Sequence, residues 1–384
     1  MSYSTNTYSI KNALISVSDK TGIVDFAKGL QELGIEIYST GGTAKILQEN
    51  NVKVKYISII TDFPEILGGR VKTLHPAVHS GLLADLSRKE HTDELEQFNF
   101  NSIDMLVVNL YPFEETLKEG GSHEELIEKI DIGGPSMIRA AAKNYKWTVP
   151  VVNPDKYDEL INILKINRAT VSENVRLQLS AEAFSLSAYY DSVISKYMRK
   201  SAEIEKSDKY SVGLNLEQEL RYGENPHQKA ELYGNFSEIF EKLHGKQLSF
   251  NNIVDIDAAA KLVNEFEKPA CAIIKHTNPC GTGVGKNISE AFKKAFDTDK
   301  FSPFGGIIAV NRKVDREFAE TVHDIFTEVI IAPSYTDDAL ELLIQKKNRR
   351  LIKLNTEKFD DYIGFDIKSV TGGYLIQDND DEIY

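Results

Sequence analysis

Short apolar runs alternate with segments of helical periodicity through the first 150 residues of the chain. Five of the runs have the length of a buried strand: 13–17, 35–39, 52–57, 105–110 and 148–152. Between the first two runs, apolar residues recur at helical spacing from Val24 to Leu33, and Gly34 is a suitable helix stop. Further helices are predicted at 43–48, 124–129 and 136–144. This alternation predicts an α/β fold with a parallel sheet that is covered by helices on both faces.

The remainder of the chain predicts a long helix, a polar segment and a second α/β unit. Residues 172–200 have helical periodicity, with Tyr190 among the side chains expected to be buried. Beyond this helix the sequence is polar and charged up to about residue 215. The strands and helices expected in the second unit are, in order, 270–275, 289–296, 306–310 and 315–326.

With 384 residues the chain is too long for one ordinary domain. We therefore divide it into a first domain, 1–200, a linker, 201–219, and a second domain, 220–384. Apolar residues make up 41% and charged residues 27%, which is typical of a folded chain rather than a disordered one. The acidic run at 378–382 is interpreted as a solvated tail.

Charge, cysteine content and hydropathy exclude several function classes. The net charge of −13 argues against nucleic-acid binding, which needs clustered Lys and Arg, but it is compatible with small phosphorylated ligands. Two cysteines, Cys271 and Cys280, are too few for a disulfide framework or a Cys-based zinc site. The sequence has neither signal-peptide features nor ~18 consecutive apolar residues, so we expect a cytoplasmic enzyme without a membrane partner.

Two loops with features of anion sites follow the first two predicted strands. The residues concerned are Ser18, Asp19 and Lys20 in the first loop and Thr40, Gly41, Gly42 and Thr43 in the second. Each loop places hydroxyl groups or bare backbone N–H groups at a helix N-terminus, where the helix dipole favours negative charge. Either loop alone is more often a helix cap than a ligand site. Two such loops after successive strands would face one crevice, which favours a shared anion site.

Three other segments add cations, an acid and polar groups at a strand end. They are Arg70-Val71-Lys72-Thr73, Asn109-Leu110-Tyr111 and Asp131-Ile132-Gly133. Two cations beside glycines suit a phosphate or an oxyanion, although a solvated basic loop is the ordinary interpretation. Arg139 and Lys143 lie one turn apart on a predicted helix, hence on one face. His75 and His79 have the spacing of a metal pair, but Pro76 and the lack of an obvious third ligand argue against zinc.

Nine strings, spread over most of the chain, carry a resemblance to a known family. They are residues 16–21 (SVSDKT), 40–43 (TGGT), 69–76 (GRVKTLHP), 109–112 (NLYP), 131–134 (DIGG), 139–144 (RAAAKN), 220–228 (LRYGENPHQ), 275–281 (KHTNPCG) and 302–306 (SPFGG). Together they resemble the bifunctional purine enzymes that combine AICAR transformylase with IMP cyclohydrolase. Physical reasoning from the residues alone reaches only an anion-binding enzyme of the α/β class.

The resemblance implies a methylglyoxal-synthase-like fold for the first domain and an incomplete, cytidine-deaminase-like α/β fold for the transformylase domain. It implies that the first domain closes formyl-AICAR to IMP: the carboxamide nitrogen attacks the formyl carbon and water leaves. The ribose phosphate would lie against 18–20 and 40–43. The implied contacts to the base are with Arg70, Val71, Lys72, Thr73, Asn109, Tyr111, Asp131, Ile132, Gly133 and Lys143. No metal or redox cofactor is implied for ring closure.

The resemblance also implies roles in the reaction for four side chains. Lys143 would donate and accept protons, and Asp131 would position or polarise the amide. Lys72 and Tyr111 would stabilise the formyl oxygen as charge develops on it. A lysine exchanges protons near neutral pH only if burial or a neighbouring cation lowers its pKa, and Arg139 is the candidate neighbour.

The downstream strings match the motifs that hold AICAR for formyl transfer from the cosubstrate 10-formyltetrahydrofolate. The implied contacts are Arg221, Tyr222, Lys275, His276 and Gly305. Lys275 and His276 would be catalytic, with His276 as the base for the amine. Adjacent Lys and His side chains point to opposite faces of a flat strand, so the pair needs a strand end or a loop, which we expect Asn278-Pro279 and Gly281 to provide.

Family sequences continue for about another domain's length beyond residue 377 of this chain. Since that part carries much of the folate site, we expect the transformylase domain to be incomplete at Tyr384 and its activity to be low. An alternative is that the chain is a fragment of the complete enzyme and that both activities need the full length.

Two other functions fit the predicted fold. A nucleotide-sensing regulatory module would need the phosphate loops but not Asp131, Tyr111 and Lys143 together, so their presence favours catalysis. Methylglyoxal synthase itself would not have the second domain. The expected partners are the phosphorylated nucleotides formyl-AICAR, IMP and AICAR, and a second copy of the chain in a homodimer.

Overall fold

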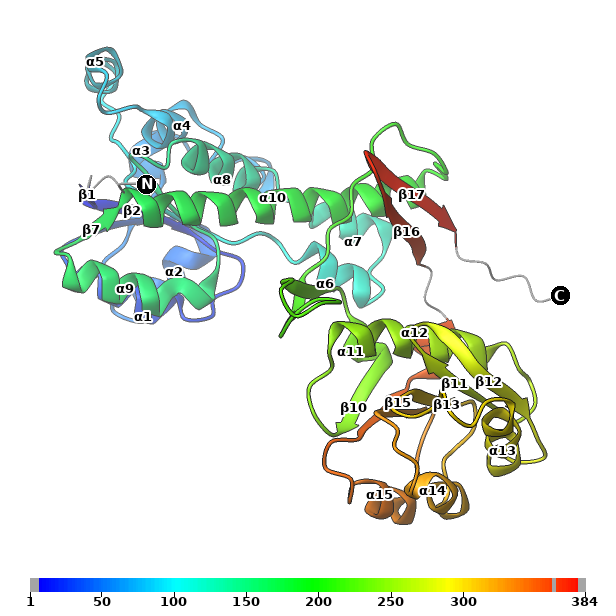
Figure 1. Cartoon of the computed structure of the whole chain (residues 1–384). Coiled ribbons are helices and arrows are strands. Elements are labelled where there is room, and N and C mark those ends of the chain that lie inside the picture. The colour runs from blue at the N-terminus through cyan, green and yellow to red at the C-terminus, as the bar shows by residue number, and fades with distance from the viewer. Residues whose placement is uncertain (1–6, 361–363, 379–384) are drawn as a thin grey trace. The chain divides into compact units, whose positions relative to one another are not determined.

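The computed structural model describes residues 7–360 and 364–378, which contain two compact units (Figure 1). The units are Met1–Gly213 and Leu214–Tyr384, and the division between them falls in the polar segment after the long helix. The acidic residues at 379–382, interpreted above as part of a tail, lie outside the described residues.

Unit 1 contains a parallel five-stranded sheet in the order β4-β3-β2-β5-β6. Its strands are Asn12–Ser16 (β2), Glu36–Ser39 (β3), Lys55–Tyr56 (β4), Met105–Val108 (β5) and Val149–Val151 (β6). In the register of the sheet, Ala13 lies opposite Ile37 of β3 and Met105 of β5. The chain moves from β2 toward one edge of the sheet and then returns to begin β5 on the other side of β2. The boundary between β2 and β5 is therefore a topological switch point, where α/β folds bind their ligands.

Helices cover both faces of this sheet, as the sequence predicted. The helices of the unit are Ile23–Glu32 (α1), Gly41–Glu49 (α2), Ser58–Thr61 (α3), Pro76–Leu83 (α4), Lys89–Gln97 (α5), Phe113–Lys118 (α6), His123–Glu128 (α7), Gly133–Lys143 (α8), Tyr157–Ile166 (α9) and Glu173–Ser201 (α10), with 3-10 turns at Leu67–Gly69 (η1) and Pro154–Lys156 (η2). Ala13 and Ile15 point into the core formed with α1 and α9. Leu14 points the opposite way, into the core formed with α4 and α8.

Local departures from the predicted elements have identifiable causes. The first helix does not begin at the Ser18–Thr21 segment but at Ile23, because Gly22 adopts a left-handed conformation with φ 67° and delays it. β4 has only two residues, both exposed, at the edge of the sheet. An antiparallel pair, Thr7–Ser9 (β1) with Thr170–Ser172 (β7), was not predicted because each strand is only three residues long.

Unit 2 contains a mixed six-stranded sheet in the order β10-β15-β14-β13-β11-β12. Its strands are Phe240–His244 (β10), Ala270–Lys275 (β11), Asn278–Val284 (β12), Ile307–Val310 (β13), Val329–Ala332 (β14) and Arg350–Leu354 (β15). β13, β14 and β15 are parallel to one another, whereas β11 is antiparallel to both of its neighbours. The predicted strands at 270–275 and 306–310 both lie in this sheet.

Helices cover both faces of the second sheet as well. They are Phe236–Ile239 (α11), Phe250–Asn264 (α12), Ile288–Thr298 (α13), Arg316–His323 (α14), Asp337–Leu343 (α15) and Thr356–Asp360 (α16). α12 packs on one face, and α13, α14 and α15 pack on the other. Two hairpins complete the unit: Leu216–Leu220 (β8) with Ala230–Tyr233 (β9), and Phe365–Val370 (β16) with Gly373–Asp378 (β17).

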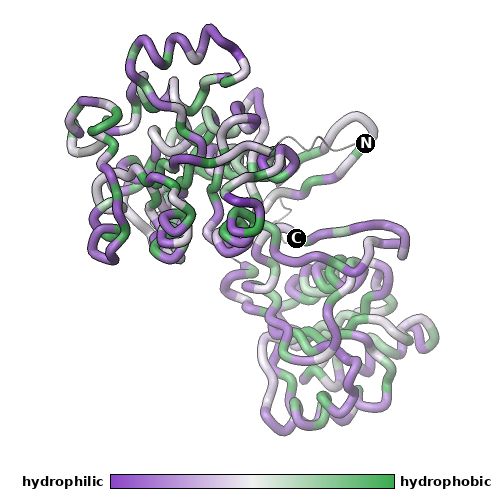
Figure 2. Tube along the Cα trace, turned by 90° about the vertical axis from the view of Figure 1, so that its left-hand side faces the viewer, coloured by the Kyte–Doolittle hydropathy of each residue, from purple (hydrophilic) through white to green (hydrophobic). Residues whose placement is uncertain are grey.

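The distribution of hydropathy follows these layers. In Figure 2 the hydrophobic stretches of the tube gather in the interior of each unit, and the outer turns are mostly hydrophilic. The central strands β5, β13 and β14 are buried at every position, whereas α5 has no buried residue. Each unit therefore has its own hydrophobic core.

Candidate active site

The loops that follow β2 and β5 in unit 1 are tied together across the switch point by Asn109. The backbone N–H groups of Ser18 and Asp19 both donate to its Oδ1, at 2.9 Å in the case of Asp19. Its Nδ2 donates to the Asp19 carbonyl at 2.8 Å. Asn109 was predicted to contact the base, but its amide is engaged on both sides with the main chain. Asn109 thus fixes the course of the loop that follows β2.

Lys20 lies in this loop, close to the cation of another predicted segment. Its Nζ donates to the carbonyls of Val17 and Ser18, the latter at 3.1 Å. Burial lowers the pKa of Lys20, and the nearby charge of Lys72 lowers it further. Two ammonium groups in one half-buried crevice repel each other unless an anion lies between them. The pair therefore favours a phosphorylated ligand.

The loop after β3 is held against the end of β2 by buried hydroxyl groups. The Ser16 and Thr40 hydroxyls are 2.8 Å apart, and the Thr43 hydroxyl donates to the Val17 carbonyl at 3.0 Å. Thr40 makes no side-chain cap to α2, so the first N–H groups of that helix stay open to a ligand. Gly41 has a φ of 30°, which favours glycine.

Asp131 lies immediately before α8 and is half-buried. Its Oδ1 accepts the Gly134 N–H at 2.8 Å. Burial raises the pKa of the Asp131 carboxyl, while the N–H groups of Gly134 and Tyr111 and the charge of Lys72 oppose this shift. An acid with a raised pKa exchanges protons closer to neutral pH than an ordinary aspartate does, which suits acid–base catalysis.

The segment that carries Lys72 passes along the start of α8. A Cβ placed on Gly133 would lie 2.8 Å from the Thr73 hydroxyl, so Thr73 touches the first turn of the helix. Thr73 itself is almost fully buried, and Ile132 is 61% exposed. Val71 pairs with Ile66 in an isolated antiparallel bridge, which fixes the course of the loop. Lys72 is thereby held beside Asp131.

A hollow of about 400 Å³ opens at this end of β5. Four of the predicted residues line it: Ser18, Asp19, Asn109 and Tyr111. The remaining walls come from α6 and α10, including Tyr189 and Tyr190, which the sequence did not single out as site residues. A volume of this size fits a small ligand.

The other residues predicted in unit 1 do not line this hollow, and two of them, Arg70 and Lys143, are exposed. The Arg70 guanidinium forms an ion pair with Glu128, and both side chains are largely exposed. Lys143 is the last residue of α8, about 15 Å along the helix axis from Gly133 at ~1.5 Å per residue, and it is exposed. Arg139, one turn earlier, lies over the Phe184 ring at 5.7 Å. Asp131 and Lys143 therefore lie at opposite ends of one helix.

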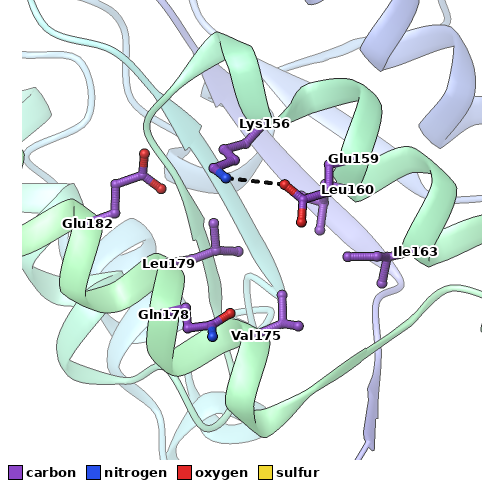
Figure 3. A pocket seen from close by; sticks show the side chains of 8 residues that line it. All are labelled: Lys156, Glu159, Leu160, Ile163, Val175, Gln178, Leu179 and Glu182. Carbon is purple, nitrogen blue, oxygen red and sulfur yellow. Dashed lines mark hydrogen bonds and ion pairs between the residues drawn. The ribbon is translucent and has the colours of Figure 1, made fainter. Parts of the chain in front are cut away.

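A second hollow, of about 220 Å³, lies between α9 and α10 (Figure 3). Val175, Gln178, Leu179 and Glu182 of α10 face Glu159, Leu160 and Ile163 of α9 across it, with Lys156 at one end. Lys156 forms an ion pair with Glu159 at 3.2 Å. None of the predicted site residues lines this hollow, so we do not assign the active site to it.

In unit 2, Lys275 and His276 lie where β11 turns into β12. The turn consists of His276 and Thr277, with φ values of 54° and 62°, as a two-residue hairpin of type I′ requires. Asp255 of α12 accepts the N–H groups of both, at 3.3 Å and 2.7 Å. The expectation that Asn278-Pro279 and Gly281 form the loop is wrong, because these residues belong to β12. The carboxylate of Asp255 stabilises a turn without glycine that sequence rules do not anticipate.

The other predicted residues of unit 2 lie next to this turn. The Lys275 ammonium donates to the Phe304 carbonyl at 3.0 Å, beside Gly305, whose φ is 76°. Arg221 lies over the ring of Tyr222 at 5.6 Å, in the loop between β8 and β9. That loop contacts Asn251, which is one turn from Asp255 on α12. One face of α12 thus contacts both motif-bearing loops.

Two protein-family models and several curated proteins are similar to this chain over most of its length. The model of the AICARFT/IMPCHase bienzyme matches residues 141–384, and the model of the MGS-like domain matches residues 22–136. A bifunctional purine biosynthesis protein PurH from Caldicellulosiruptor saccharolyticus is 50% identical over 382 residues, which cover 96% of this chain and 74% of that protein. The protein of the same name from Bacillus subtilis is 49% identical over 385 residues, covering 97% and 73%.

The chain belongs to the AICARFT/IMPCHase bienzyme family. A solved structure, "Crystal structure of ForH", is 32% identical and covers 50% of this chain and all of its own, with a TM-score of 0.44. Family membership confirms purine biosynthesis by a bifunctional transformylase and cyclohydrolase, and it confirms the two predicted fold classes in their predicted order. A separate regulatory module is not favoured.

Residues 7–360 and 364–378 contain neither a candidate membrane-spanning helix nor a candidate metal site. No helix among them has the length and apolar character needed to cross a lipid bilayer. No group of three or more His, Cys, Asp or Glu side chains is arranged there to hold a metal ion.

Proposed function

We propose that unit 1 closes formyl-AICAR to IMP in the crevice at the carboxyl ends of β2, β3 and β5. The observation that carries this proposal is the half-buried Asp131 with its raised pKa, held by the Gly134 N–H and placed near Lys72. The two phosphate loops lie at adjacent strands of the same sheet edge. A phosphorylated ligand anchored there presents its base toward the end of β5.

The phosphate binds between Lys20 and the open N-terminus of α2 in this proposal. Lys20 supplies charge, and the first turn of α2 supplies backbone N–H groups beside Gly41 and Gly42. A Cβ on Gly42 would meet no atom within 4 Å, so an anion can approach the backbone there. Thr40 and Thr43 fix this loop to the end of β2, because their hydroxyls hydrogen-bond to the Ser16 hydroxyl and the Val17 carbonyl.

Ring closure requires that the carboxamide nitrogen lose a proton as it attacks the formyl carbon. The formyl oxygen takes up two protons, in balance with one lost by the carboxamide nitrogen and one lost by the formamido nitrogen, and leaves as water. Asp131 is positioned to accept or return a proton, since its pKa is raised by burial. Lys72 stabilises negative charge that builds on the formyl oxygen, and Tyr111 adds its hydroxyl at the same strand end.

Lys143 is proposed as a proton donor and acceptor from the match of 139–144 to the family motif. Within unit 1 it lies at the far end of α8 from Asp131. Asp131 is therefore the group that the geometry of unit 1 supports most directly for proton exchange, and the two proposals predict different mutational effects.

The second activity is proposed for unit 2. Arg221, Tyr222, Lys275, His276 and Gly305 would hold AICAR, with His276 as the base for its amine and 10-formyltetrahydrofolate as the formyl donor. The support is the shared contact of their loops with α12. A homodimer and a cytoplasmic location are proposed from the family resemblance.

The proposal for Asp131 is tested with the full chain by following the formation of IMP from formyl-AICAR. Asp131→Asn keeps the shape of the side chain but removes the titrating group, so we expect a loss of kcat of ~10²–10⁴. Asp93→Asn is the matched control, because Asp93 lies on α5, which has no buried residue. Equal turnover in both variants would remove Asp131 from the mechanism.

A further inference from the structure

Tyr190 is a buried residue in the middle of α10, far in the sequence from the motifs of the active site. With Phe113 and Leu126 it forms a small core between α10, α6 and α7. The rings of Phe113 and Tyr190 meet edge to face, with centroids 6.5 Å apart. This packing fixes the ring and leaves the hydroxyl as the polar end of the side chain.

The hydroxyl of Tyr190 makes two hydrogen bonds to the segment between α7 and α8. It donates to the Lys129 carbonyl at 2.8 Å and accepts the Asp131 N–H at 2.9 Å. Burial raises the pKa of Tyr190 to about 12, so the hydroxyl keeps its proton throughout the neutral range. One neutral group thus holds both ends of the peptide segment that leads into Asp131.

Three elements converge on Asp131 as a result. The N–H group of Gly134 donates to its carboxylate from the start of α8, and Tyr111 of the loop after β5 lies close enough to oppose the rise of its pKa. Tyr190 binds its backbone from α10. Residues 129–132 join α7 to α8, and the N–H groups of Lys129 and Ile130 donate to carbonyls of α7. The N–H of Asp131 donates instead to the Tyr190 hydroxyl, so its position depends on this contact from α10.

We propose that Tyr190 is a positioning residue for ring closure, which holds the backbone of Asp131 so that its carboxylate faces the reacting amide. This inference rests on the proposed role of Asp131 in the cyclohydrolase site. A displacement of about 1 Å at a reacting group can lower the rate by ~10²-fold, so loss of one of several contacts is expected to lower it by about tenfold.

The test compares two tyrosines of α10 that differ in what their hydroxyls contact. Tyr190→Phe keeps the ring and its packing on Phe113 but removes both hydrogen bonds. Tyr197→Phe is the matched control: its hydroxyl contacts His123 at 2.8 Å, and its ring also packs against Phe113. Asp131→Asn is measured beside them in the full chain.

The quantities measured are kcat and KM for formyl-AICAR and the midpoint of thermal unfolding. We expect Tyr190→Phe to lower kcat about tenfold, with KM within about twofold of wild type. Tyr197→Phe should leave kcat and KM unchanged. Its unfolding midpoint should shift by an amount similar to that of Tyr190→Phe. This split between kcat and stability distinguishes positioning from a general loss of packing.

Three results would overturn the inference, and they are distinguishable from one another. If Asp131→Asn is inactive but Tyr190→Phe turns over like Tyr197→Phe, the positioning role is wrong and the proposed site stands. If Asp131→Asn turns over like wild type, the proposed role of Asp131 fails and the role of Tyr190 fails with it. A loss of kcat in Tyr190→Phe that is matched by Tyr197→Phe would also reject it.

Discussion

At the scale of single residues, the feature that suits Asp131 to proton exchange also costs folding free energy. Burial disfavours the ionised carboxylate in the folded chain, and the N–H groups of Gly134 and Tyr111 and the charge of Lys72 offset only part of this. The unfolded chain does not bear this cost. Active sites commonly retain such destabilised groups because function requires them.

Asp131→Asn should therefore raise the thermal stability of unit 1 at pH 7 while it lowers turnover. Because the folded-state pKa is raised, the cost of ionisation is absent below the unfolded-state pKa and grows as pH rises through the folded-state value. The difference in unfolding midpoint between variant and wild type should thus be largest near pH 7 and shrink toward pH 4. A variant that is less stable than wild type at pH 7 would contradict this.

Lys20→Ala should weaken the binding of both substrate and product, because Lys20 supplies charge to the proposed phosphate site. Loss of a charged hydrogen bond is worth ~1.5–3 kcal/mol, so the Kd for IMP should rise by ~10-fold or more in calorimetry. Lys28→Ala, which removes an exposed lysine from α1, is the control. If Lys20→Ala bound IMP with unchanged affinity, the phosphate would not bind beside Lys20.

Because Lys143 lies at the far end of α8 from Asp131, we expect substitutions of the two residues to lower kcat by different amounts. Asp131→Asn should lower kcat at least tenfold more than Lys143→Ala does, since only Asp131 lies at the carboxyl ends of the strands. Lys143→Ala should leave the affinity for IMP largely intact. The reverse order in single-turnover measurements would show that Lys143 reaches the ligand and Asp131 does not.

At the residue scale the sequence indicated which loops follow the strands, whereas contacts between distant segments could not be predicted from it. Lys20, Thr40 and Thr43 lie at the end of the sheet where loop chemistry placed them. The hydroxyl of Tyr190 reaches Asp131 across 59 residues, and no local pattern encodes that contact. The ion pair of Arg70 with Glu128 likewise depends on a segment 58 residues away.

At the scale of elements, long apolar runs were predicted as strands, whereas the buried strand β14 was missed. The strand predicted at 270–275 is β11 with the same bounds, because a continuous apolar run there is flanked by polar residues. β12 was missed, since its alternating glycines resemble a loop. The glycines are explained by packing: α13 lies so close that a Cβ on Gly283 would be 2.2 Å from the Ala291 carbonyl oxygen.

Gly283→Ala should accordingly destabilise unit 2. A methyl group at this position must displace α13, and overpacking of this kind costs about 1–3 kcal/mol. The unfolding transition of unit 2 should move down by ~2–4 °C per kcal/mol. Gly373→Ala is the control, since a Cβ there meets nothing within 4 Å. If Gly283→Ala and Gly373→Ala had equal unfolding midpoints, α13 could move away from the sheet at little cost in folding free energy.

At the scale of the whole molecule, the order of the motif strings predicted the family and the two fold classes, and physical patterning alone did not. The cyclohydrolase strings from 16 to 144 all lie in unit 1, and those from 220 to 306 all lie in unit 2. Each unit has its own sheet and core. The proposed ring-closure site therefore draws its residues from one unit.

The most direct test of the central claim is the turnover of formyl-AICAR by residues 1–213 expressed alone. Formation of IMP is followed by its ultraviolet absorbance, and circular dichroism establishes that the fragment is folded. Because every residue of the proposed cyclohydrolase site lies within unit 1, we expect kcat within about threefold of the full chain. A folded fragment that binds IMP but does not close the ring would contradict the account.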